Sequence, residues 1–414
     1  MSPGVPDAAL ARDIRRNTLL LGSAFAVGWS IIQLQSALTA ITTELLTGQT
    51  AIAGVGSAIF LLALGLVAVP AGRLMDHVGR GPVLVLGFAA AAVASGLVFV
   101  AVQNRLVVPF FGGIAALGLG LGTVNLARAG AADMAPPEQR AARVGRVLLG
   151  AAVGAILGPI VFSPLLANRV ADPVSLAVPW ILAAGLSVLG AVIVLGMRRD
   201  PLAIARELGL RGQPVVGPAR GRGIRGVYVD PALRAGLLAV IVSQVVMSAA
   251  MSTVGLGMVH AGHDLQSISV ALAVHFVGMF GLSPLLGRVV DRIGRRLAIS
   301  VGLCVVATGA FGLALGTSLV VILPSIFLVG AGWSLAYLSG TALIADATVP
   351  QERAAALGAL DLGSLVGSAG ATLVAPAVLG LYGLPPLAIA AALIALLPAL
   401  LLFASGRRVV APAN

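Results

Sequence analysis

The feature that most constrains this chain is a series of apolar stretches, each roughly 20 residues long, separated by short polar breaks. A helix of about that length crosses the ~30 Å hydrocarbon core of a bilayer. Lipid offers no partner for an open strand edge, so spanning segments must be helices or closed barrels. The stretches 83–102 and 388–403 do not alternate apolar and polar residues as barrel strands do. The sequence therefore predicts an all-α membrane protein.

Charged residues and Pro/Gly-rich breaks mark the ends of the expected helices. With 59% hydrophobic and 10% charged residues, the chain is far more apolar than a soluble domain. About twelve transmembrane helices are predicted, over residues 18–41, 51–71, 82–102, 106–132, 143–167, 176–197, 235–259, 267–287, 297–315, 319–343, 355–379 and 385–405.

The arginines indicate how these helices are oriented. The chain has no lysine, and its net charge of +11 comes from arginines that lie mostly in alternate loops, whereas the opposite loops hold Arg105 and Arg169. Positive residues are retained on the cytoplasmic side. We therefore expect a multi-pass protein of a bacterial-type inner (plasma) membrane with both termini in the cytoplasm. Because membrane orientation accounts for the positive charge, we expect no nucleic-acid partner.

A hydrophilic segment at 198–234, rich in Arg, Gly and Pro, divides the spans six and six. The predicted organisation is a cytoplasmic N-terminal tail (1–17), an N-terminal six-helix half (18–197), a cytoplasmic central linker (198–234), a C-terminal six-helix half (235–405) and a cytoplasmic tail (406–414).

Two loops recur at the same place in each half. The first contains Gly72, Asp76, Gly79 and Arg80, and its repeat contains Gly287, Asp291, Gly294, Arg295 and Arg296. A second pair of loops places Asp133 in one half and Asp346 in the other, each followed by Pro and Arg at equal spacing. This repetition indicates duplication of a six-helix unit.

The repeated loop resembles the signature G-x-x-x-D-x-x-G-R-[KR] of the major facilitator superfamily, with Gly81 where a second basic residue is usual in the first copy. The resemblance implies two six-helix repeats with a substrate site between them near mid-membrane, and alternating access between the two sides. It also implies that the loop stabilises the outward-open state and that Asp133 and Asp346 are further partners of the loop.

The predicted fifth helix contains Gly145, Gly154, Gly158 and Pro159, which resemble the antiporter motif G-x8-G-x3-G-P-x2-G-G of this family, although Phe162 and Ser163 replace its last glycines. Small residues at this spacing allow close helix packing, and a proline bends a helix. The resemblance implies export, of the twelve-helix drug/proton antiporter type. Pro109 stands where such exporters commonly carry an arginine, which puts proton coupling through that arginine in doubt.

Polar residues within the spans are candidates for a substrate cavity or gate, because burying them in lipid is costly. These candidates are Gln33, Asn125, Arg128, Gln244, His275, Tyr337 and Asp361. Arg128 and Asp361 lie at similar depth in different halves, so we predict a gate in which they pair. The alternative is that Arg128 extends to the headgroups and Asp361 pairs within its own half.

The predicted function is secondary active transport of a small molecule, most consistent with a proton-coupled exporter of amphipathic compounds. No phosphate-binding loop for ATP is present, and the four histidines and Cys304 do not form a metal-ligand pattern, so no cofactor and no metal are expected. Import of a small polar nutrient is the alternative on the same fold. A membrane-embedded enzyme or receptor is the remote alternative. The expected partners are the substrate, protons and the lipid bilayer, and we expect a monomer.

Overall fold

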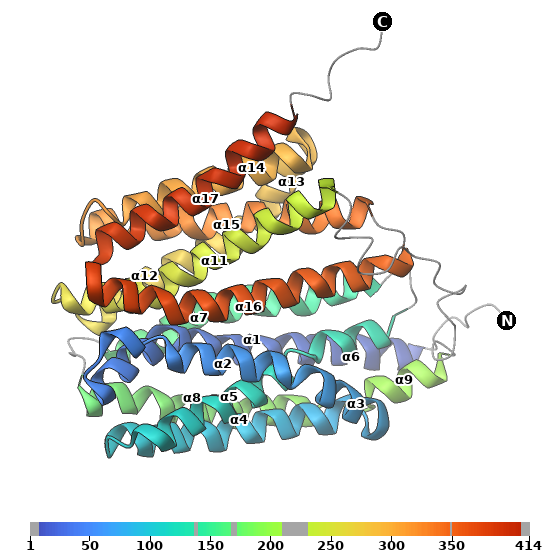
Figure 1. Ribbon diagram of the computed structural model, residues 1–414. Coiled ribbons are helices and arrows are strands. Elements are labelled where there is room, and N and C mark those ends of the chain that lie inside the picture. The colour runs from blue at the N-terminus through green and yellow to red at the C-terminus, as the bar shows by residue number, and fades with distance from the viewer. Residues whose placement is uncertain (1–7, 136–139, 167–171, 209–230, 348–349, 407–414) are drawn as a thin grey trace, which may run out of the picture. The chain divides into compact units, whose positions relative to one another are not determined.

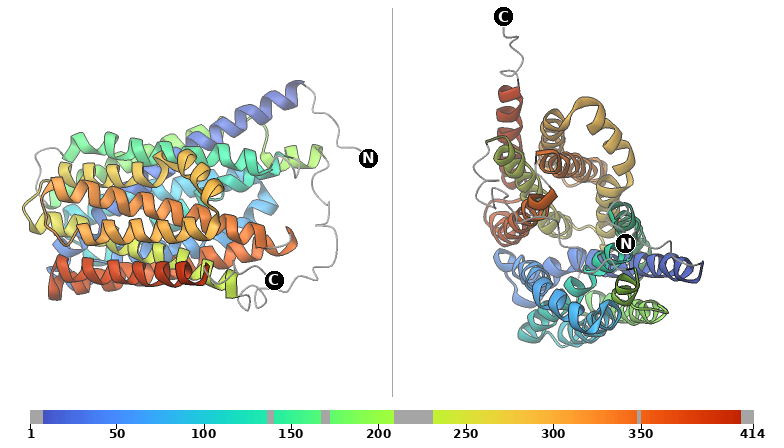
Figure 2. Two further views of the ribbon diagram at one scale, coloured as in Figure 1. Left: turned by 90° about the horizontal axis from the view of Figure 1, so that it is seen from above. Right: turned by 90° about the vertical axis from the view of Figure 1, so that its right-hand side faces the viewer.

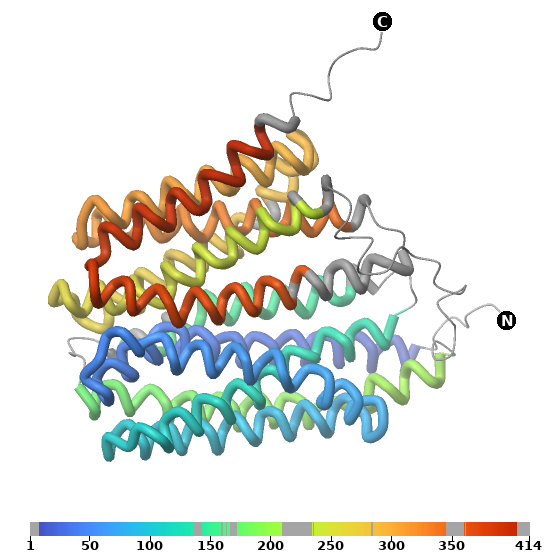
Figure 3. Tube along the Cα trace, in the orientation of Figure 1, coloured from blue at the N-terminus to red at the C-terminus, as the bar shows by residue number. Residues whose placement is uncertain are grey.

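The computed structural model describes residues 8–135, 140–166, 172–208, 231–347 and 350–406 (Figures 1 and 3). In these ranges the chain forms helices and no strands. Eleven helical segments of the described chain are long and apolar enough to span a membrane, and a bent pair, Leu265–Gly281 with Leu285–Ile293, supplies a twelfth. The predicted all-α membrane fold is confirmed.

The first of two compact units comprises residues 1–48 and 59–216. Within it, α1 packs against α7 and α8, and α4 packs against α5 and α8 (Figure 1). The described helices that lie wholly in it are α1 (Ala8–Thr47), α3 (Ala68–Val78), α4 (Arg80–Gln103), α5 (Val107–Val124), α6 (Ala127–Asp133), α7 (Arg140–Leu166), α8 (Pro173–Leu195) and α9 (Pro201–Glu207).

The second unit comprises residues 49–58 and 217–414. Within it, α11 packs against α15 and α16, and α14 packs against α15 and α17 (Figure 2). Its described helices are η1 (Thr50–Ile52), α11 (Pro231–His260), α12 (Leu265–Phe276), the π-helical turn η3 (Val277–Gly281), α13 (Ser283–Ile293), α14 (Arg295–Gly312), α15 (Leu319–Ala347), α16 (Pro350–Tyr382) and α17 (Leu384–Gly406). The short η1 lies against α16, and α2 (Val55–Leu66) begins in this unit.

Several helices differ from the predicted spans at their ends or by a break. The first helix starts ten residues earlier than predicted, at Ala8 instead of residue 18, because Leu10, Ile14 and Asn17 are buried against the rest of the first unit. The predicted span 106–132 is two helices, broken at Asn125 and Leu126. The predicted span 267–287 bends by 50° beyond η3. The segment predicted as a linker begins with α9, whose Leu202, Ile204 and Ala205 are buried.

Candidate functional site

The first signature loop is built around Gly79, which ends α3 and begins α4 with φ 105°. Residues that have a Cβ rarely adopt a positive φ of this kind, whereas glycine does so without a steric clash. The repeat of this loop uses Gly294 in the same way, with φ 83°, between α13 and α14. The same positive-φ glycine turn therefore occurs in the loop of each unit.

Arg80, the first residue of α4, lies between two carboxylates. Its Nη1 is 3.0 Å from Oδ1 of Asp76 on α3, and its Nε donates to Oδ2 of Asp133 on α6 at 2.7 Å. Hydrogen bonds between charged groups are short and strong, and they gain strength where water is partly excluded. The Arg80 side chain is 11% exposed, so the pair with Asp133 is well shielded. Arg80 thereby links α3, α4 and α6.

Asp200, in the segment predicted as a linker, closes the other side of this loop. Its Oδ2 accepts a hydrogen bond from the backbone N–H of Gly81 at 2.7 Å, and its Oδ1 accepts one from Leu202 N at 2.8 Å. One carboxylate therefore caps both α4 and α9. A Cβ at Gly81 would lie 3.2 Å from Cε of Met197 and 3.3 Å from Oδ2 of Asp200, so a larger residue there would require these side chains to shift.

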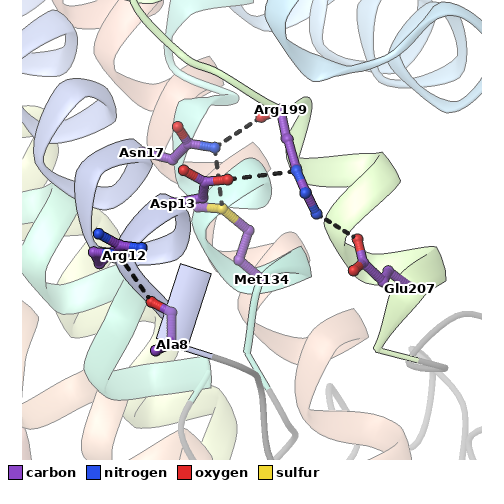
Figure 4. A network of polar contacts seen from close by, with 7 residues as sticks. All are labelled: Ala8, Arg12, Asp13, Asn17, Met134, Arg199 and Glu207. Carbon is purple, nitrogen blue, oxygen red and sulfur yellow. Dashed lines mark hydrogen bonds and ion pairs between the residues drawn. The ribbon is translucent and has the colours of Figure 1, made fainter. Parts of the chain in front are cut away.

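The residue before it, Arg199, fixes the same segment to α1 (Figure 4). Its Nε lies 3.4 Å from Oδ2 of Asp13, and its Nη1 donates to Oε2 of Glu207 at 2.9 Å. Its carbonyl oxygen accepts a 2.8 Å hydrogen bond from Nδ2 of Asn17, which is fully buried. We define Asp13, Asn17, Arg199, Asp200 and Glu207 as the linker clamp.

In the second loop, Nη1 of Arg295 lies 2.6 Å from Oδ1 of Asp291, whose side chain is 72% exposed. Arg296 is exposed. The side chain of Asp346, the implied further partner, is outside the described part of the chain. The described Asp291–Arg295 pair is thus more exposed to solvent than the pairs that Arg80 forms with Asp76 and Asp133.

The glycines predicted in the fifth helix lie on α7. A Cβ at Gly154 would come within 2.9 Å of the carbonyl carbon of Ala26 and closer still to its oxygen, and one at Gly158 would lie 3.2 Å from Cα of Ser30. Ser30 Oγ also donates to the carbonyl oxygen of Gly154 at 3.1 Å. The pattern therefore marks a tight contact between α7 and α1.

This contact does not follow the motif completely. Gly145 is exposed, and a Cβ there would meet nothing within 4 Å. Gly150, which is outside the motif, packs against the backbone of Gly22 on α1. The Pro159 side chain is outside the described part of the structure. Close packing thus accounts for Gly154 and Gly158 and leaves Gly145 without a packing reason.

In the second unit, Gln244 on α11 is the centre of a polar and aromatic cluster. Its Oε1 accepts a 2.6 Å hydrogen bond from Nε1 of Trp333 on α15, and its Nε2 donates to Oγ of Ser368 on α16 at 3.1 Å. Ser248 Oγ donates to Ser368 Oγ at 2.8 Å. The rings of Trp333 and Tyr337 stack at 5.0 Å and 15°.

A fourth element completes this cluster. Phe280, in the π-helical turn η3, meets Trp333 edge-on, with ring centroids 6.3 Å apart at an angle of 76°. We call Gln244, Ser248, Phe280, Trp333, Tyr337 and Ser368 the amide–aromatic cluster. It brings together two of the predicted cavity residues, Gln244 and Tyr337, on helices α11 and α15 of one unit.

Comparison with known proteins decides the family. The model of the Major Facilitator Superfamily matches residues 18–256 and again residues 236–413. The chain belongs to the Major Facilitator Superfamily. The twofold match agrees with the predicted duplication, and membership makes the protein a membrane transporter.

Relatives of this transporter extend the comparison. It is 32% identical over 341 residues to the uncharacterized MFS-type transporter YdeG of Bacillus subtilis, an alignment covering 81% of this chain and 79% of YdeG. It is 25% identical over 347 residues to the riboflavin transporter RfnT of Brucella anthropi, covering 84% and 85%. Among solved structures, the nucleoside transporter NupG shares the fold with a TM-score of 0.71 at 13% identity, over 94% of this chain and 98% of NupG.

The other predicted cavity residues of the transporter are not among the described side chains that form the amide–aromatic cluster. Gln33 on α1 is 3% exposed, and neither amide atom has a hydrogen-bond partner among the described residues. Asn125 follows the last residue of α5, and Arg128 is exposed on α6. His275 on α12 is fully buried, with Nδ1 2.9 Å from the carbonyl oxygen of Ile326. The Asp361 side chain lies outside the described part, so the gate stays a prediction.

Sequence reasoning missed several residues that the structure brings to these sites. Asp200 precedes Pro201, and an acidic residue followed by proline is typical of a helix start, so this signal was available. Ser364 and Ser368 lie one helical turn apart on α16, a spacing that places them on one face. Phe280 carried no comparable signal, because a π-helical turn has no simple sequence pattern.

Proposed function

We propose that this transporter is a proton-coupled exporter of amphipathic small molecules. The observation that carries the proposal is the amide–aromatic cluster, which combines hydrogen-bonding groups with aromatic rings and contains no charged side chain. Such a surface suits molecules that have both apolar and polar parts, whereas a substrate with fixed charges would require opposite charges in the protein.

The direction of transport rests on α7. Gly154, Gly158 and Pro159 match part of the antiporter motif, and the first two lie in a tight contact with α1. Gly145 matches the motif without a packing role, which favours a function for the pattern beyond close packing. These features support export in exchange for protons.

We assign the binding of the coupling proton to Asp361. It lies within α16 immediately before Leu362, where the described candidate membrane span of this helix begins, and a carboxylate that enters the hydrocarbon region is costly unless it is paired or protonated. A proton binding there would weaken the predicted pair with Arg128 and so link proton movement to opening of the gate.

The test uses everted membrane vesicles that contain the full-length protein and are energised to acidify their lumen. Uptake of the neutral amphipathic dye Nile Red into the lumen, which corresponds to export from a cell, should exceed that of vesicles without the protein and should collapse when a protonophore is added. The Asp361→Asn variant should lose the part of dye uptake that the proton gradient drives. Uptake that is unaffected by the protonophore would overturn the coupling.

A second candidate is uptake of a small polar nutrient. The relative named riboflavin transporter, aligned over 84% of this chain, favours this alternative. Expression in a bacterial strain that cannot make riboflavin and lacks its own riboflavin transporter separates the two candidates. Growth on low external riboflavin would support uptake, and growth that does not improve would count against riboflavin as an imported substrate.

A further inference from the structure

We infer that the amide–aromatic cluster binds the ring of a planar, uncharged heteroaromatic compound, with Gln244 reading the hydrogen-bonding edge of that ring. This inference rests on the proposed function, since it names the class of substrate that the transporter would carry. Its basis is the arrangement of side chains around Gln244 in the second unit.

The stacked pair supplies the flat surface. Trp333 and Tyr337 are one helical turn apart on α15, nearly parallel at 15°, and both side chains are partly exposed. Aromatic rings favour offset stacking and edge-to-face contacts with other rings. Phe280 already adds an edge-to-face contact to Trp333 and stays partly exposed itself. Three rings from two elements therefore present a surface suited to another flat ring.

Gln244 supplies the directional contact. A glutamine amide has two N–H donors and an oxygen with two lone pairs. The bonds to Ser368 and from Trp333 use one donor and one lone pair, and they fix the orientation of the amide. One donor and one lone pair remain, and the side chain is partly exposed. A ring that carries adjacent N–H and C=O groups matches this remaining pair.

Ser364 on α16 is a second polar group that could contact a ligand. Its side chain is 8% exposed, and its Oγ has no hydrogen-bond partner among the described residues. It lies one turn before Ser368 and one turn after Leu360, and Leu360 belongs to the apolar cluster against which Tyr337 packs. Leaving a buried hydroxyl without a partner costs free energy. A ligand group at this level of α16 would satisfy it.

The helices that carry the three rings pack closely, and one of them contains a π-helical turn. Gly330 lets α15 approach α12, and His275 joins the same two helices through the carbonyl oxygen of Ile326. Phe280 lies in the π-helical turn η3, immediately before the 50° bend of this span. Turns of this type occur frequently at functional sites. The ring surface is thus carried by α15 and a locally altered helix.

None of the side chains of the cluster is charged, which defines the part of the substrate bound here. A charged ring buried without a counter-charge would lose its hydration without compensation. The ring is therefore neutral, and any charge of the substrate lies on another part of the molecule. The inferred class is neutral lactams, imides and related fused heteroaromatic compounds.

The test measures binding to the purified full-length protein in detergent, so that it does not depend on transport. The probes are 2-quinolone, a flat neutral lactam, and decahydro-2-quinolone, which keeps the N–H and C=O groups and has no aromatic ring. In a protein carrying Trp29→Phe and Trp180→Phe, Trp333 is the remaining tryptophan of the three in the chain. We expect 2-quinolone to change its fluorescence and to bind about three- to tenfold more tightly than the saturated probe, from the worth of one ring contact.

The variants separate the contributions of the cluster. Measured calorimetrically in the otherwise native protein, Trp333→Leu and Tyr337→Leu should remove the preference for the flat probe, and Tyr337→Phe should keep it. Gln244→Leu should weaken both probes equally. Trp180→Phe, in the first unit, is the matched control and should change the affinity for neither probe. Each variant is first checked for an unchanged elution profile and helix content.

Several results would overturn the inference. They are equal affinity for the two probes, no binding of 2-quinolone, or a preference that survives in folded Trp333→Leu and Tyr337→Leu proteins. The proposed function is tested by a different measurement. Dye transport that is absent, or that is insensitive to a protonophore, would reject the proposed function and would leave the binding result unaffected. Conversely, proton-driven dye export without any preference for the flat probe would reject the inference and retain the proposed function.

Discussion

Replacing Gly154 by alanine should separate the packing role of the α7 glycines from any other role they have. A Cβ there would lie 2.9 Å from the carbonyl carbon of Ala26 and 3.0 Å from its Cα. Carbon atoms pack best at about 3.5–4.0 Å, and the carbonyl oxygen of Ala26 would be closer still, so α1 and α7 would have to separate by roughly 1 Å or more. Both partners are backbone, and neither can rotate away as a side chain could.

The expected magnitude follows from two opposing terms. Overpacking a tight contact costs about 1–3 kcal/mol, and removing glycine from a helix interior regains up to about 1 kcal/mol. Gly154→Ala should therefore lose about 1–2 kcal/mol of stability. Gly145→Ala is the matched control on the same helix, since its Cβ would meet nothing within 4 Å. That variant should be unchanged or slightly more stable.

Thermal unfolding of both variants in the same detergent, followed by tryptophan fluorescence, measures this difference. Dye transport in vesicles is recorded alongside. If Gly154→Ala unfolds at the same temperature as Gly145→Ala or above it, the packing argument is wrong. If Gly145→Ala is stable and loses transport, the antiporter-like pattern has a role beyond packing.

Three further outcomes are expected. Asp133→Asn should lower stability by about 1–3 kcal/mol, because it weakens a shielded bond to an arginine, whereas the exposed Asp291→Asn should cost less; thermal unfolding and transport at matched expression compare them. Asp200→Ala removes the cap of two helices, so we expect a loss of about 1–2 kcal/mol by the same assay, and an unchanged melting temperature would contradict the clamp. Arg128→Asp and Asp361→Arg should each abolish vesicle transport, and the double variant should regain part of it; a double variant that is folded and inactive would refute the gate.

Much of the transmembrane fold could be predicted because lipid removes the alternatives to helices. Apolar length alone located the spans, and the repeated Gly-x-x-x-Asp-x-x-Gly-Arg loop revealed the duplication. Each copy of the loop turns at a glycine with positive φ, Gly79 or Gly294, a conformation that residues other than glycine rarely take. The helix ends were less accurate, as the early start of α1 and the break at Asn125 show.

Side-chain contacts between distant helices were decided by the tertiary structure. Asp200 follows Gly81 by 119 positions, and Ser368 follows Gln244 by 124, so no local pattern relates the members of either pair. The cluster around Trp333 also includes Phe280, which the π-helical turn η3 presents where this span packs against α15. The sequence by itself determined the helices and their repetition, because those follow from local apolar length and spacing, and its signature loops resembled those of the family. Which polar side chains meet depended on helix rotation and packing, which are properties of the folded units.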